Sequence, residues 1–160
     1  AVSSANPKIA DYEFTTLKPS LGVVDYISDK SFVISDIPGL ITGASKGIGL
    51  GFQFLKHLSR TRLILQMIDV EGKETKDIEE ESKVLLLELE EYDVHLTEKV
   101  KWLVLNKIDL IPKEKQMKLK EYFDKQQDLE VSLISAKNRI GTENLMKEVG
   151  FTLEKIDEQE

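Results

Sequence analysis

Short apolar runs alternate with longer amphipathic segments along the second part of the chain. The apolar runs occupy residues 63–70 (LILQMIDV), 100–105 (VKWLVL) and 131–135 (VSLIS). Runs of this length with few polar positions are typical of strands that are covered on both faces. The segments 76–96, 113–126 and the one that begins at Thr142 carry apolar residues at helical spacing. This alternation predicts parallel strands joined by crossover helices.

The first part of the chain has a different pattern. Residues 21–27 (LGVVDYI) and 31–37 (SFVISDI) are rich in β-branched side chains, and turn-forming residues lie between them. This pattern predicts a β-hairpin after an irregular start. A glycine-rich stretch at 39–51 and a helical segment at 52–59 follow. We therefore expect one α/β domain over residues 1–160, a three-layer sandwich with a mostly parallel sheet.

Polar residues stand where the predicted strands end. They are Asp36, Asp69, Asn106 and Ser135. In open α/β sheets, ligands bind at the carboxyl ends of the strands. The sequence around these four residues is therefore the first place to look for a binding site.

The first of these positions begins the run Asp36-Ile37-Pro38-Gly39. An aspartate that leaves a strand can hold Mg²⁺ through a water molecule. A glycine directly after it allows a backbone N–H to approach a phosphate closely. The same four residues are also common in ordinary turns, so this motif alone does not establish a phosphate site.

The third position begins the run Asn106-Lys107-Ile108-Asp109. A carboxylate here can accept two N–H hydrogen bonds from the amidine edge of guanine, a pair that adenine does not offer. Asn106 could bond the other edge of the base and tie neighbouring loops together, and the aliphatic part of Lys107 could lie over the base plane. The alternative interpretation is that Asn106 and Asp109 only cap the following helix.

The last position begins the run Ser135-Ala136-Lys137. A small residue here allows a backbone N–H to reach the O6 atom of guanine, which also selects against adenine. This short run is weak by itself. However, the three motifs occur in order, each after a predicted strand, and together they match the later motifs of a GTP-binding domain.

Composition narrows the classes of protein that remain. The chain is 41% hydrophobic and 32% charged, which is too apolar for a disordered chain. No window reaches the roughly 18 apolar residues that a membrane span needs, so we expect no membrane association. The net charge of −7 argues against binding nucleic acid through a broad basic face, so we expect no direct DNA binding.

Two further features bear on chemistry and location. The chain has no cysteine and two histidines, His57 and His95, which excludes thiolate catalysis and argues against a zinc site. Residues 1–11 lack the basic and apolar regions of a secretory signal. We therefore expect a cytoplasmic protein.

Two upstream segments extend the match beyond the strand ends. Residues 6–17 (NPKIADYEFTTL) and 19–24 (PSLGVV) are similar to the switch I region of the Obg/CgtA family of GTPases. Residues 36–41 (DIPGLI) and the glycines and apolar residues at 43–55 are similar to its switch II region. The resemblance extends over essentially the whole chain and implies a P-loop NTPase-type G domain.

The resemblance also implies an activity. Members of this family bind GTP and GDP with Mg²⁺, hydrolyse GTP slowly, and act in assembly of the large ribosomal subunit and in the stress response. In Ras-type GTPases a glutamine that orients water follows the glycine of the second switch, whereas Leu40 stands at that position here. Leu40 can neither orient nor deprotonate water, so we name no catalytic residue.

Site residues follow from the same match. Thr16 and Asp36 would hold Mg²⁺, and Phe14, Thr15, Thr16, Leu17 and Lys18 would flank the nucleotide. Asp36, Ile37, Pro38 and Gly39 would serve the γ-phosphate. Asn106, Lys107, Ile108, Asp109, Ser135, Ala136 and Lys137 would recognise guanine.

The chain departs from the family pattern in three respects. Glu13 and Thr42 replace residues that are usual in the family. More importantly, the phosphate loop G-x-x-x-x-G-K-[ST] does not occur in these 160 residues. In the family this loop would precede Ala1, together with a central first strand. We therefore expect that the sequence is part of a longer chain, and that the 160 residues alone bind nucleotide weakly.

Two other functions compete with this interpretation. Residues 42–49 (TGASKGIG) match the cofactor loop of short-chain dehydrogenases, and Asp69 follows at a position where a ribose-binding acid would be sought. That class also needs a Tyr-x-x-x-Lys motif far downstream, whereas the spacing occurs here only at Tyr26 and Lys30, upstream of the loop. The third possibility is a non-catalytic interaction module.

Overall fold

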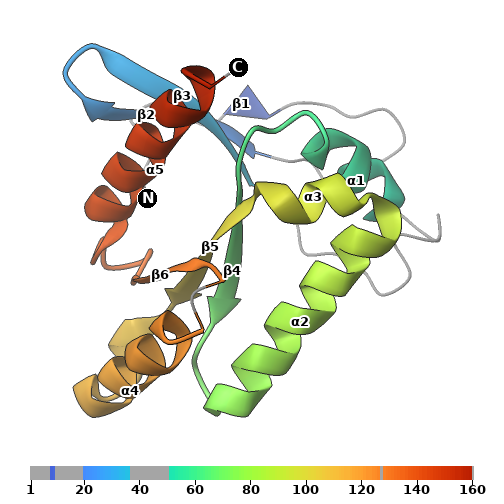
Figure 1. The fold of residues 1–160 in the computed structure, drawn as a ribbon. Helices are drawn as coiled ribbons and strands as arrows, with labels where there is room; N and C mark the ends of the chain where they lie inside the picture. The colour runs from blue at the N-terminus through green and yellow to red at the C-terminus, as the bar shows by residue number, and fades with distance from the viewer. Residues whose placement is uncertain (1–7, 10–19, 37–50, 127, 160) are drawn as a thin grey trace.

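The computed structural model describes residues 8–9, 20–36, 51–126 and 128–159, with the backbone alone at residues 8–9 and 51–54. The elements lie in two three-stranded sheets with helices around them (Figure 1). The strands are β1 (Lys8–Ile9), β2 (Ser20–Ile27), β3 (Lys30–Asp36), β4 (Ile64–Asp69), β5 (Val100–Asn106) and β6 (Glu130–Leu133). The helices are α1 (Gly51–Leu58), α2 (Thr75–Tyr92), α3 (Val94–Lys99), the 3₁₀ turn η2 (Ile108–Leu110), α4 (Lys113–Asp124) and α5 (Thr142–Asp157).

The second sheet is parallel, in the order β4-β5-β6, as the alternating pattern predicts. Its central strand β5 is buried along almost its whole length, because helices cover both of its faces. The register places Asp69 directly beside Asn106, so that β4 and β5 end at the same level. This register brings the polar strand ends together.

The first sheet is antiparallel and contains the predicted hairpin. Strands β2 and β3 pair along their length, and the turn between them includes Asp29 with a positive φ of 61°. Aspartate tolerates this left-handed conformation better than most residues, which explains its place in the turn. The short strand β1 extends the sheet beside β2, whereas the sequence pattern predicts an irregular start.

Helices on both faces make the parallel sheet the middle of three layers (Figure 1). On one face, Ile78 of α2 and Leu119 and Phe123 of α4 share a core cluster with side chains of the three parallel strands. On the other face, α5 buries Leu145, Met146 and Val149. The layered α/β fold predicted from the sequence is therefore confirmed.

Helix α5 also connects the two sheets. Its buried side chains share one cluster with Val24 of β2 and with Trp102 and Val104 of β5. Next to this cluster, the ring of Tyr26 lies against Gly150, where a Cβ atom would overlap the ring. The Tyr26 hydroxyl donates a hydrogen bond of 2.5 Å to Oε1 of Glu154.

One predicted helix is in fact two. The periodicity predicts a single helix over 76–96, but α2 ends at Tyr92 and α3 begins at Val94. Asp93 separates them because its side chain accepts a hydrogen bond of 3.0 Å from the backbone N–H of His95. This N-cap interaction satisfies a helix donor and stops the preceding helix. Among the helices that the structure describes, none combines the length and apolar character of a membrane span.

Gly141, the residue before α5, tests how tightly the last strand and the last helix are joined. Its φ is +72°, and a Cβ atom would lie 2.6 Å from the carbonyl oxygen of Leu133. We expect Gly141→Ala to lower the free energy of unfolding by about 2–4 kcal/mol, from the backbone conformation and the overlap together. Urea unfolding measures this loss.

Gly72 provides a matched control for that substitution. Its φ is +68°, but nothing lies within 4 Å of the place that a Cβ would occupy. Gly72→Ala should therefore cost only the conformational part, about 1 kcal/mol. Equal losses in the two variants would contradict the tight contact at Gly141.

The contact between Tyr26 and Glu154 predicts a dependence of stability on pH. The hydrogen bond to Glu154 raises the pKa of Tyr26 to about 12, from an ordinary value of 10.0. Between these values the unfolded chain loses a proton that the folded protein keeps, so stability falls as pH rises. We expect the difference in unfolding free energy between the wild type and Tyr26→Phe to be constant below pH 10 and to shrink from about pH 10 to about pH 12.

The comparison variant for this pH series is Tyr122→Phe, because Tyr122 lies on α4 and bonds Glu79 instead. Urea unfolding of the three proteins between pH 8 and pH 12 gives the profiles. A Tyr26→Phe profile that runs parallel to the wild type above pH 10 would show that the hydroxyl does not bond Glu154.

Candidate functional site

The side chain of Asn106 connects three strand ends. Its Nδ2 donates a hydrogen bond of 3.0 Å to Oδ1 of Asp69, at the end of β4. Its Oδ1 accepts one of 3.0 Å from the backbone N–H of Ala136, in the loop after β6. Since a carboxylate can only accept and a backbone N–H can only donate, these partners determine the orientation of the amide.

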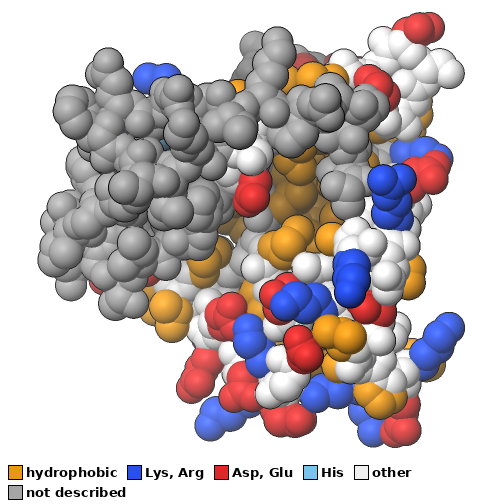
Figure 2. Space-filling model, turned by 180° about the vertical axis from the view of Figure 1, so that it is seen from behind, with side chains coloured by type: hydrophobic (Ala, Val, Ile, Leu, Met, Phe, Trp, Pro, Cys, Tyr) orange, Lys and Arg blue, Asp and Glu red, His pale blue; other side chains and the backbone are white. Residues whose placement is uncertain are grey.

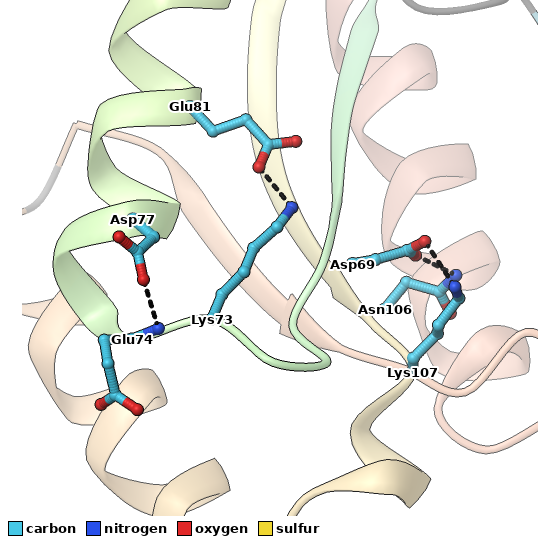
Figure 3. Close-up of polar contacts among 7 residues, drawn as sticks. All are labelled: Asp69, Lys73, Glu74, Asp77, Glu81, Asn106 and Lys107. Atoms are coloured by element: carbon cyan, nitrogen blue, oxygen red, sulfur yellow. Dashed lines mark hydrogen bonds and ion pairs between the residues drawn. The ribbon is translucent and has the colours of Figure 1, made fainter.

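Lys107 follows with an unusual backbone. Its φ and ψ of 65° and 34° lie in the left-handed region, which non-glycine residues rarely adopt. Its Nζ lies 2.9 Å from Oδ2 of Asp69, and both side chains are 44% exposed. The hydrogen bond to Asp69 is the main cause that raises the pKa of Lys107. Figure 3 shows both oxygens of Asp69 in use, one by each neighbour. We call Asp69, Asn106, Lys107 and Ala136 the strand-end cluster.

The turn after Lys107 is fixed by hydrogen bonds with two neighbouring segments of the chain. Ile108 is buried, and its backbone N–H donates to the carbonyl oxygen of Ile134 at 3.2 Å. The side-chain amide of Gln116 on α4 donates to the carbonyl oxygens of Ile108 and Ile111. The rigid turn η2 therefore presents Asp109 with an exposed carboxylate. A carboxylate in this position can accept two adjacent N–H donors from a ligand.

The loop after β6 is fixed by Ser135. This residue is fully buried, and its Oγ accepts a hydrogen bond of 3.2 Å from the backbone N–H of Asn138. Its backbone pairs with Ile140 in both directions at 3.0 Å. Ala136 is half-buried beside Asn106, and Lys137 is exposed. The loop thus turns back on itself and holds Ala136 against the end of β5.

The structure brings together part of the predicted site. Seven of the predicted residues lie at the ends of β5 and β6: Asn106, Lys107, Ile108, Asp109, Ser135, Ala136 and Lys137. Asp36 is the last residue of β3 and is exposed. The other predicted residues lie outside the described part of the chain: Phe14, Thr15, Thr16, Leu17, Lys18, Ile37, Pro38 and Gly39.

Asp36 is the predicted Mg²⁺ ligand that the structure describes. Its exposed carboxylate, at the carboxyl end of a strand, is a hard oxygen donor of the kind that Mg²⁺ prefers. Across residues 20–36, 55–126 and 128–159, no three acidic or imidazole side chains gather to form a metal site. Mg²⁺ keeps several of its waters in nucleotide sites, so a single carboxylate fits this ion.

Sequence reasoning missed the link from Asp69 to Asn106 and Lys107. It placed Asp69 among the polar residues at the strand ends, but gave it a specific role only in the competing dehydrogenase interpretation, as a ribose-binding acid. In the structure both carboxylate oxygens instead bond the strand-end cluster. The available indication was that Asp69 and Asn106 each end an apolar run, because parallel neighbours of equal length place such residues side by side.

The surface beside this site carries charges of both signs. Figure 2 shows Lys and Arg side chains interspersed with Asp and Glu over the lower part of the molecule. On α4, three pairs lie at i,i+4 spacing: Lys118 with Glu114, Lys120 with Asp124, and Lys125 with Glu121. Charges paired in this way do not form a field of one sign.

Comparison with known proteins gives a family match and two similar structures. The family model described as 50S ribosome-binding GTPase matches residues 1–107. The cytosolic domain of the FeoB iron transporter of T. maritima is 18% identical with a TM-score of 0.62, and the alignment covers 95% of this chain. Nucleolar GTP-binding protein 1 of Plasmodium falciparum is 20% identical with a TM-score of 0.61, and the alignment covers 99% of this chain.

The two structural matches establish the fold. This chain spans 56% of the length of the FeoB chain and 78% of the length of the nucleolar protein. Both alignments have TM-scores above 0.6 and cover nearly the whole of this chain, so the layered α/β fold is shared. The family model covers more than half of the chain and includes the whole of β5 with Asn106 and Lys107. The chain therefore belongs to the family of 50S ribosome-binding GTPases.

Proposed function

We propose that this protein binds GTP and GDP through the carboxyl ends of its strands and hydrolyses GTP slowly. The observation that carries the proposal is the exposed carboxylate of Asp109, which η2 presents beside Asn106. Guanine offers two adjacent donors on one edge, N1–H and the 2-amino group, and a carboxylate accepts both. Adenine has an acceptor at N1 and no 2-amino group, so the same carboxylate selects against it.

The rest of the base site follows from the neighbouring loops. Asn106 has a second amide hydrogen beyond the one given to Asp69, and this hydrogen is suited to the N7 atom of the base. The backbone N–H of Ala136 donates to Asn106 in this structure, and in the proposed site it would also serve the O6 atom of the base. Ser135 and the buried Ile108 support this arrangement from behind.

Phosphate binding belongs to the other predicted residues. Asp36 and Thr16 would hold Mg²⁺, which when bound neutralises charge on the phosphate oxygens. Residues Phe14 to Lys18 would flank the nucleotide. Ile37 and Gly39 would place backbone N–H groups at the γ-phosphate, and Pro38 between them, which has no N–H, would fix the backbone there. Leu40 follows Gly39 and cannot orient water, so the proposed turnover is low and no residue of this chain is named as a general base.

The dehydrogenase interpretation is not favoured. The family match covers residues 42–49, the loop on which it depends. Asp69 bonds Asn106 and Lys107, and the Tyr26 and Lys30 side chains both bond Glu154 on α5. The residues that would serve a nicotinamide reaction are therefore engaged in structural contacts.

We further propose that the protein is an Obg-type GTPase of the cytoplasm that acts in assembly of the large ribosomal subunit and in the stress response. The name of the matching family and the resemblance of residues 6–24 to the Obg switch I region support this assignment. With a net charge of −7, the domain is not suited to grip RNA over a broad face. Contact with the ribosome would then depend on local surfaces that change with the bound nucleotide.

Replacing Asp109 tests the base site. We expect Asp109→Ala to weaken GDP binding roughly 10- to 100-fold, because charge-assisted hydrogen bonds to guanine are lost. Inosine diphosphate lacks the 2-amino group, so the wild type should prefer GDP over it and the variant should not. Titration of the full-length protein with fluorescent analogues of GDP, IDP and ADP measures both quantities.

Asp128→Ala is the matched control for this substitution. Asp128 is an exposed aspartate two residues before β6, at the opposite end of the strands from Asp109. The control should bind GDP as the wild type does. An Asp109→Ala protein that still prefers GDP over IDP would refute the proposed base site.

Sedimentation tests the proposed partner. The full-length protein should co-sediment with large ribosomal subunits in a non-hydrolysable GTP analogue more than in GDP, because the γ-phosphate orders switch segments. Small subunits in a parallel gradient provide the control. Equal or absent binding in all nucleotide states would count against a role in large-subunit assembly.

A further inference from the structure

Asp69 is the member of the strand-end cluster that makes no contact with the base in the proposed site. It is the last residue of β4, one strand away from the guanine motif. Both of its carboxylate oxygens are used by residues of that motif: Oδ1 by Asn106 at 3.0 Å and Oδ2 by Lys107 at 2.9 Å. One side chain on a neighbouring strand thus contacts the first two residues of the motif.

We propose that Asp69 is a positioning residue that orients Asn106 and Lys107 for recognition of the guanine base. This inference rests on the proposed function of the site. Asp69 itself contacts no nucleotide in the proposed arrangement. It acts through the two side chains that it holds, and it thereby affects the affinity for the base.

The first step of the argument concerns the Asn106 amide. This group must present its remaining N–H to the base, which requires that its oxygen and nitrogen stay in their present places. Ala136 holds the oxygen and Asp69 holds the nitrogen, at 3.0 Å each. Without the carboxylate, the nitrogen loses its acceptor and one of the two restraints on amide rotation is gone.

The second step concerns Lys107. A lysine side chain has four rotatable bonds and loses much conformational freedom when it is held in place. The left-handed backbone of Lys107 and the contact of its Nζ with Asp69 together direct the side chain toward β4. The aliphatic part of the Lys107 side chain is then restrained before any ligand binds. Ligand binding therefore carries a smaller cost in conformational entropy.

The third step concerns magnitude. The ion pair between Asp69 and Lys107 is 44% exposed on each side, and solvent screens pairs this exposed so that they contribute little to stability. The loss is small beside the total stability of a typical domain. A protein that lacks the carboxylate should therefore still fold, and its defect should lie in ligand binding.

The test compares Asp69→Asn with Asp69→Ala in the full-length protein. Asp69→Asn keeps an oxygen that can accept from Asn106 but loses the charge that holds Lys107, whereas Asp69→Ala loses both contacts. We expect GDP to bind about threefold more weakly to Asp69→Asn and about tenfold more weakly to Asp69→Ala. Binding of IDP should weaken by the same factors, because its base keeps the N7 atom and the ring plane that Asn106 and Lys107 would contact. The preference for GDP over IDP, which depends on Asp109, should remain.

The control is Glu71→Gln, which removes a carboxylate two residues further along the loop. Glu71 is exposed and acts on Lys107 through its charge at a distance, without a hydrogen bond to it. This variant changes the net charge as Asp69→Asn does. It should bind GDP and IDP as the wild type does.

A spectroscopic readout separates positioning from simple stabilisation. The ¹⁵N–¹H₂ signals of the Asn106 side chain, observed without nucleotide, should move in Asp69→Ala and stay in place in Glu71→Gln. Moved signals together with an equal loss of affinity for GDP and IDP support the inference. Unmoved signals overturn it, and so does an Asp69→Ala protein that melts earlier but binds GDP as tightly as the wild type does.

The design also distinguishes this inference from the proposed function. If the wild type shows no preference for GDP over IDP and ADP, the proposed function fails and the inference falls with it. If the wild type prefers GDP and both Asp69 variants bind GDP as tightly as the wild type does, the proposed function stands and the role of Asp69 alone is refuted.

Discussion

The apolar face of α5 is the contact on which the arrangement of the whole chain depends. Among the described residues, no backbone ladder joins β3 to β4, so the hairpin and the parallel sheet are not one hydrogen-bonded sheet. They share instead a single core cluster in which α5 packs on β2 and β5 at once. The bonds of Glu154 to Tyr26 and Lys30 hold the hairpin at the outer edge of this contact. The position of Asp36 relative to the other strand ends therefore depends on side-chain packing.

Within the parallel sheet, hydrogen bonds and not packing alone determine how the strand ends are placed. The backbone register brings Asp69, Asn106 and the loop after β6 to one level, and side-chain hydrogen bonds then join them. These bonds lie on top of a rigid layer that includes the buried Ile108 and Ser135. The polar site is thus supported by buried residues beneath it, which is the usual way in which folded proteins hold a binding geometry.

Much of this fold could be predicted from the sequence, because its strands are distinct apolar runs and its helices have clear periodicity. The break at Asp93 was not predictable from periodicity, since it depends on one capping hydrogen bond inside an otherwise continuous pattern. The N-K-x-D motif predicts the base site by its residue types. The role of Asp69 could not be recognised in the same way, because it depends on the register between two strands that are 30 residues or more apart in the chain. The predictions for Phe14 to Lys18 and for Ile37 to Gly39 remain predictions, since they lie outside the described residues.

The left-handed backbone of Lys107 has a consequence for the variation that this position can accept. A non-glycine residue in that conformation costs on the order of 1–2 kcal/mol, whereas glycine adopts it freely. Selection for stability alone would therefore favour glycine here, and only selection for what the side chain does would retain lysine. At position 107, stability thus favours glycine and function favours lysine. Directed evolution toward heat resistance would therefore tend to replace Lys107 before other residues of the site.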